Sequence, residues 1–187
     1  MKNAYLHPIL EDAAALPARM RSAFSQLSAD QLNWKPNPET WSIGECIDHI
    51  MITNRSYFAQ FEAIARGDKF VSIWEKLSLL HGMVGRMLIK ATGETVTQKA
   101  KSPAVFKPTR SKVPANIVEE FCAQQAELIA RVEKIDHVDH HRVLINSPMS
   151  SLVFYTLHDA LVIIFQHEQR HFRQSLSVKA RLEFPNN

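Results

Sequence analysis

Apolar side chains recur at helical spacing over several long segments, and this periodicity constrains the fold more than any other feature. The clearest stripe comprises Ile43, Ile47, Ile50, Phe58 and Phe61. Residues three or four positions apart share one face of a helix, whereas a strand directs every second residue to one face. Runs of alternating apolar and polar residues are scarce, and only 5 of the 187 residues are glycine. The pattern predicts an all-α protein.

The helical pattern divides the chain into four long segments. Helices are expected over residues 4–28, 42–66, about 114–134 and about 156–180. Ser42 and Glu45 have the spacing of a capping box at the start of the second helix, and Gly67 is placed to end it. A loop is expected over 135–150, before the last helix.

Residues 69–111 are the least regular part of the sequence. We expect a helix over 74–90 and an extended stretch over 102–114, which contains three prolines. The chain contains no internal repeat, low-complexity tract or linker, so a single domain is expected over residues 1–187.

Composition and charge narrow the function classes. The chain has 22 Lys and Arg against 19 Asp and Glu, and the basic residues are scattered, which argues against a nucleic-acid partner. The longest apolar run, at 161–165, is far too short to span a bilayer, and no targeting signal is visible. Cys46 and Cys122 lie far apart in apolar segments, as reduced core cysteines do. We expect a soluble cytoplasmic protein without a membrane partner.

The strongest chemical signal is the pair His167 and His171 within the last expected helix. Residues four apart lie on one helix face, about 6 Å apart along the axis, so two imidazoles can reach one metal ion. Both histidines lie beside the apolar stripe of that helix, as a metal site inside a bundle requires. The alternative is two polar residues at the rim of a buried face. The stripe comprises Leu157, Leu161, Ile164 and Phe172.

The same residues match the HExxH pattern of zinc peptidases, with Glu168 as a candidate general base. Such a site needs a third ligand downstream, but the 16 residues after His171 include no histidine, and Glu183 is the one acidic candidate. The third ligand is therefore expected upstream. His49, at the flank of the apolar stripe of the second helix, is the candidate; the alternative is a histidine packed at a helix interface.

The chain resembles the DinB-like family. The matching stretches are Trp41–Glu45 with His49 one turn further on, Ser147-Pro148, Leu157–Leu161, and His167–His171 with Gln174; the stretch Gln98–Pro108 is also similar. The resemblance implies a four-helix bundle with a long crossover connection between the second and third main helices. It also implies a metal site formed by His49, His167 and His171. One divalent transition metal is expected there, zinc or nickel first, with iron or manganese as alternatives.

Three functions remain open at this stage. The first is a metal-dependent enzyme acting on a small molecule, either a hydrolase or a low-molecular-weight thiol transferase, because some relatives transfer thiols. The second is a non-catalytic metal-bound stress or binding protein, since no clear nucleophile or cofactor loop is present. The third is an HExxH-type peptidase. A homodimer is expected on general grounds.

Other polar residues have two interpretations each. Glu45 can orient His49 from one turn away or serve the capping box alone. Glu168 can act as a base or be a buried carboxylate that needs a partner such as an arginine. His137, His140 and His141 are expected in a solvated loop, and His81 and His158 are expected to be structural.

Overall fold

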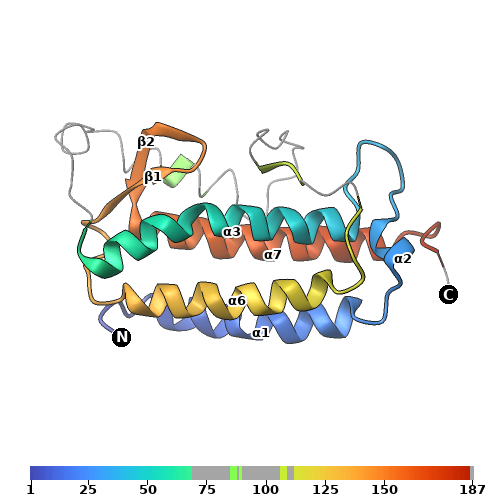
Figure 1. The fold of residues 1–187 in the computed structure, drawn as a ribbon, viewed down its shortest axis with the longest axis horizontal. Helices are drawn as coiled ribbons and strands as arrows, with labels where there is room; N and C mark the ends of the chain where they lie inside the picture. The colour runs from blue at the N-terminus through green and yellow to red at the C-terminus, as the bar shows by residue number, and fades with distance from the viewer. Residues whose placement is uncertain (69–84, 88, 90–105, 109–111, 186–187) are drawn as a thin grey trace.

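Four long helices form most of the structure, a computed structural model that describes residues 1–68, 85–87, 89, 106–108 and 112–185. They lie side by side in two layers, one made of α3 and α7 and the other of α1 and α6 (Figure 1). Helix α3 also packs against α6, and α1 against α7, so each long helix contacts both layers. The bounds are α1 Leu6–Phe24, α2 Ala29–Asn33, α3 Ile43–Arg66, α6 Ile117–Lys134 and α7 Leu157–Lys179.

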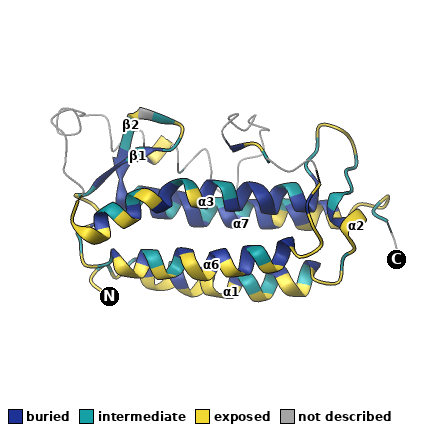
Figure 2. Ribbon diagram, viewed as in Figure 1, coloured by how far each residue is buried: buried dark blue, intermediate teal, exposed yellow. Residues whose placement is uncertain are grey.

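The direction of the helices follows from the colour run in Figure 1. Helices α1 and α7 run one way, and α3 and α6 run the other way. Helices α3 and α6, which precede and follow residues 67–116, are therefore parallel to each other. Buried residues of all four helices meet between the layers, and exposed residues line the outer side of α1 and α6 (Figure 2). Helix α3 is buried or half-buried over most of its length.

The helical character of the predicted all-α class is confirmed, and so are the signals at both ends of α3. The Glu45 backbone N–H donates to Ser42 Oγ over 3.0 Å, and the Ser42 N–H donates to Glu45 Oε2 over 2.8 Å. Gly67 ends the helix with φ of 77°, in the left-handed region that favours glycine. The first helix ends at Phe24 rather than at residue 28.

The expectation of a loop over residues 135–150 was wrong in part, because a β-hairpin precedes α7 in the chain. Strand β1 (Leu144–Ser147) pairs antiparallel with β2 (Ser150–Thr156). Ile145 and Tyr155 are paired across the ladder and are both buried against the helices, and the Tyr155 hydroxyl lies 2.8 Å from that of Tyr57. A mostly helical fold with a small two-stranded sheet replaces the all-α expectation.

The expected helix over 74–90 and the extended stretch over 102–114 fall largely outside the described residues. Residues 85–87 and 89 are helical, as predicted. Among the helices that are described, none is both long and apolar enough to cross a membrane.

The start of α3 packs tightly between α2 and the segment that precedes α6. A Cβ at Gly44 would stand 2.1 Å from Val113 Cγ2 and 3.1 Å from the Leu32 carbonyl oxygen. Val113 is itself buried, and its backbone is hydrogen bonded on both sides to the Asn33 side chain. A glycine inside a helix is thus explained by close packing rather than by backbone conformation.

Gly44→Ala tests this packing, because two effects of opposite sign compete. Alanine is the better helix former by about 1 kcal/mol, yet its methyl group overlaps Val113, and overpacking of this kind costs about 1–3 kcal/mol. We expect the variant to be less stable in urea unfolding. Gly44→Ala combined with Val113→Ala should lose less stability than the sum of the single changes. A stabilised Gly44→Ala variant would contradict the packing.

Candidate metal centre

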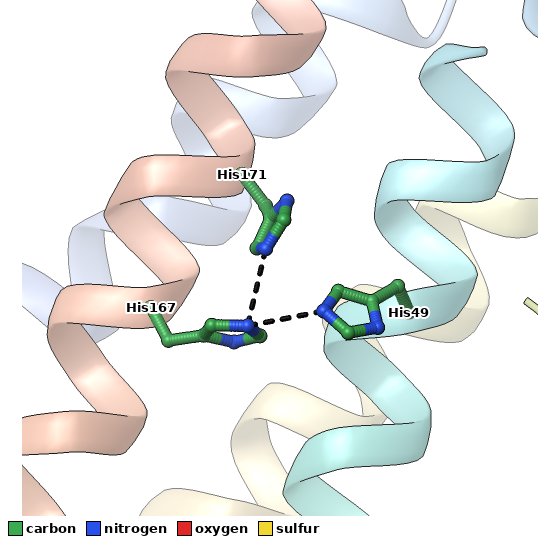
Figure 3. A group of neighbouring side chains, drawn as sticks. All are labelled: His49, His167 and His171. Atoms are coloured by element: carbon green, nitrogen blue, oxygen red, sulfur yellow. Dashed lines mark hydrogen bonds between the residues drawn. The ribbon is translucent and has the colours of Figure 1, made fainter. Parts of the chain in front are cut away.

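Three histidines from two adjacent helices point toward one another in the layer formed by α3 and α7 (Figure 3). His167 Nε2 lies 3.0 Å from His49 Nε2 and 3.1 Å from His171 Nε2. His167 and His171 are one turn apart on α7, and His49 is presented by α3 from the opposite side. The structure therefore brings together the three residues that the sequence singled out.

The donor set fits a divalent transition metal. Zinc is bound by histidine nitrogens at about 2.0–2.1 Å, so tetrahedral ligand atoms stand about 3.3–3.4 Å apart. The Nε2 separations of 3.0 and 3.1 Å are close to that value. Among the described residues, these three histidines form the one group of three or more His, Cys, Asp or Glu side chains close enough to share an ion. The cluster could hold one metal ion through three nitrogen ligands.

The protonation of His49 is fixed by its backbone partner. Its Nδ1 lies 2.5 Å from the carbonyl oxygen of Phe106, which can only accept a hydrogen bond. Nδ1 therefore carries the proton, and in the neutral ring Nε2 presents a lone pair to the centre of the cluster. Metal-binding histidines are oriented in this way by a partner on their other nitrogen.

Burial keeps the three imidazoles neutral. It lowers the pKa of His49, holds the pKa of His167 well below its usual range, and lowers the pKa of His171 to about 3. The neighbouring histidines act in the same direction on His167 and His171, while the Gln174 side chain opposes the shift at His171. Neutral imidazole is the form that binds a metal ion, so the site is ready for one without first losing protons.

An aromatic side chain lies against two of the three rings. Trp41 is nearly parallel to His171, at 29° with ring centroids 5.7 Å apart, and is tilted against His49 with centroids 4.7 Å apart. The sequence placed Trp41 in a family-like motif but gave it no role at the site, because a tryptophan beside a loop is usually part of a core.

Among the described residues, the hydrogen bonds of the Glu45 side chain go to groups other than His49. Its Oε2 accepts from the Ser42 backbone N–H, and its Oε1 lies 3.0 Å from Lys35 Nζ. Of the two interpretations of Glu45, the structure therefore shows the capping box.

Glu168 is fully buried and faces α3 and α6 rather than the triad. Its Oε1 accepts from Asn54 Nδ2 over 2.7 Å, and its Oε2 accepts from Gln125 Nε2 over 3.0 Å. Burial raises the pKa of this carboxyl to about 8, although both amide donors oppose the rise. The expected partner was a cation such as arginine, and the partners found are two amides.

The remaining histidines divide between core and surface. His140 is fully buried, with Nδ1 2.7 Å from the Tyr5 hydroxyl and Nε2 3.0 Å from the Ile135 carbonyl oxygen, so the solvated position expected for it was wrong. His137 and His141 are exposed, as predicted. His158 packs against His141 with ring centroids 4.3 Å apart, in agreement with a structural role. His81 lies outside the described residues.

Both cysteines are free and buried, as predicted. Burial raises the pKa of the Cys46 thiol to about 12, so it stays protonated at neutral pH. Neither cysteine is part of the histidine cluster.

Comparison with known proteins places the chain in a family. The sequence profile described as "DinB superfamily" matches residues 13–175, which include all three histidines. The chain belongs to the DinB superfamily. One relative is the "Uncharacterized protein YuaE" of Bacillus subtilis (strain 168), 23% identical over 158 residues, or 84% of this chain and 88% of the relative. No solved structure matches the chain significantly.

The raised pKa of Glu168 predicts a pH-dependent effect of Glu168→Gln in metal-free protein. An unfolded glutamate titrates near 4.5, whereas the folded one titrates at about 8. Between these values the folded state holds a proton that the unfolded state releases, so the contribution of Glu168 to stability is lost as pH rises. The difference in unfolding free energy between Glu168→Gln and the unmodified protein should therefore change in favour of the variant as pH rises from 4.5 to 8, by at most about 1.4 kcal/mol per pH unit.

Glu133→Gln is the matched control for this measurement, because Glu133 is exposed on α6. Its difference from the unmodified protein should stay constant over the same pH range. A constant difference for Glu168→Gln as well would show that the buried carboxyl titrates at its ordinary value.

Proposed function

We propose that this DinB-superfamily protein is a metal-dependent enzyme that acts on a small molecule through His49, His167 and His171. The convergence of three Nε2 atoms from two helices carries the proposal. A divalent ion held by three neutral imidazoles retains an open coordination position, where it lowers the pKa of a bound water or thiol. The reaction classes that fit are hydrolysis and the transfer of a low-molecular-weight thiol.

The residues of the chain contribute orientation and a defined charge state to this site. The Phe106 carbonyl fixes the tautomer of His49, and burial keeps all three rings neutral. Three neutral ligands leave the full double charge on the ion, which favours an anionic ligand in the open position. Zinc and nickel suit a set of three imidazoles, and iron or manganese would need further oxygen ligands.

The position of Glu168 favours a second candidate, a metal-bound protein without catalytic activity. No carboxylate among the described residues joins the histidine cluster to serve as a base. The same observation weighs against a peptidase, because the general base of an HExxH site must reach the water on the metal, and both oxygens of Glu168 are held by amides.

Further expectations from the sequence remain part of the proposal. We propose that α1, α3, α6 and α7 form the four-helix bundle of the family, with a long crossover between α3 and α6 and a single domain over the whole chain. The parallel direction of α3 and α6 supports the crossover. Free buried cysteines support a reducing cytoplasmic location. The homodimer is proposed on general grounds alone.

The metal site is tested by elemental analysis of protein purified without an affinity tag or nickel column. We expect about one metal ion per chain, because the three histidines together hold a single ion, and loss of that ion in His49→Ala, His167→Ala and His171→Ala. His158→Ala, on the same helix as two of the ligands, should keep it. Metal retained without His49 but lost without His167 would favour the peptidase. Metal-free native protein would remove the basis of the proposal.

Activity then separates the enzyme from the binding protein. Loaded protein is assayed against panels of esters, amides and electrophiles with and without small thiols, with His49→Ala as the inactive control. Saturable turnover that His49→Ala lacks supports the enzyme. Metal binding without turnover supports the second candidate, and peptide cleavage lost in Glu168→Gln would support the peptidase.

A further inference from the structure

We infer that Trp41 is a positioning residue of the metal centre: its indole holds the rings of His49 and His171 so that both Nε2 atoms face one ion. This inference rests on the proposed metal site. Trp41 itself offers no ligand atom, and it would act through the two histidines that it contacts.

The ring contacts place Trp41 against a particular side of the triad. The three imidazoles are mutual neighbours, with centroid separations between 4.4 and 4.8 Å. Trp41 adds a fourth ring that contacts His49 at 4.7 Å and His171 at 5.7 Å. His49 comes from α3 and His171 from α7, so the indole spans the seam between the two helices that supply the ligands.

The two histidines differ in what else restrains them. His49 is oriented by the hydrogen bond from Nδ1 to the Phe106 carbonyl oxygen. For His171, no described group meets Nδ1 with strict hydrogen-bond geometry, and the Gln174 side chain is the polar group that interacts with the ring. The torsion that turns an imidazole about its Cβ–Cγ bond is soft, so a ring without such a bond is oriented mainly by packing. The nearly parallel indole of Trp41 supplies that packing for His171.

The position of Trp41 is in turn fixed by the start of α3. It directly precedes Ser42, whose N–H and hydroxyl are both engaged in the capping box with Glu45. The remaining oxygen of Glu45 pairs with Lys35, in the loop that leads to Trp41. A closed set of polar contacts therefore holds the backbone beside the indole, and the half-buried indole rests on the two imidazoles.

The test is cobalt binding to metal-free protein, which reports affinity and ligand geometry without any assay of activity. Co²⁺ affinity is measured by competition with a chromophoric chelator, and the visible absorption of bound Co²⁺ reports the coordination geometry. The variants are Trp41→Ala, Trp41→Leu and Trp41→Phe. Trp34→Phe is the matched control, because Trp34 packs edge-on against Phe184, away from the triad. Far-UV circular dichroism establishes that each variant is folded.

We expect Trp41→Ala and Trp41→Leu to bind Co²⁺ at least about tenfold more weakly, as loss of a group that orients a ligand does, and with an altered spectrum. Trp41→Phe should retain the Co²⁺ affinity and spectrum of the unmodified protein, and Trp34→Phe should leave both unchanged. Trp41→Leu carries the test if Trp41→Ala fails to fold.

Two results would overturn the inference while leaving the metal site intact. In the first, Trp41→Ala has the Co²⁺ affinity and spectrum of the unmodified protein. In the second, Trp41→Leu binds Co²⁺ as well as Trp41→Phe does, so that any large apolar side chain would serve in place of an aromatic ring. If the unmodified protein binds Co²⁺ no better than His49→Ala, the proposed function fails first, and the inference fails with it.

Discussion

The packing of α3 against α7 is the contact on which the candidate site depends. His49 is on one of these helices and His167 and His171 are on the other, so the Nε2 separations of 3.0 and 3.1 Å exist only while the helices keep their register. Apolar residues on both sides of the site, such as Ile50 and Ile164, are fully buried. Close packing of a core resists sliding, and it therefore supplies the precision that a metal centre needs.

The buried carboxyl of Glu168 is paired with two amide side chains from neighbouring helices. Glu168 accepts from Asn54 on α3 and Gln125 on α6, and the Gln125 side chain also contacts the Ala13 carbonyl oxygen on α1. One buried carboxyl thus connects contacts to all four long helices. An unpaired buried polar group costs about 1–3 kcal/mol, so these contacts favour one register of the helices over alternatives that would leave the amides and the carboxyl unpaired.

Much of the fold and the triad could be predicted from the sequence, for physical reasons that are specific to each element. Helical spacing of large apolar residues located the long helices, and the Ser42 and Glu45 pair located the start of α3. The hairpin was missed because β1 has four residues, too few to show alternation beside the turn residues around Pro148. The i, i+4 spacing identified His167 and His171, but their partner His49 was identified by its place on an apolar stripe and by resemblance.

What the sequence could not show is how the ligands are oriented. The partner of His49 is the backbone carbonyl of Phe106, and a backbone group leaves no signature in the side-chain pattern. The partners of Glu168 were equally hidden, because helix geometry separates its direction from that of His167 and His171 but does not show which groups of the neighbouring helices it meets. The capping box at Ser42 also has a consequence that its sequence pattern does not show. It marks the start of α3 and at the same time fixes the backbone next to Trp41, so the start of the helix and the orientation of the histidines are connected.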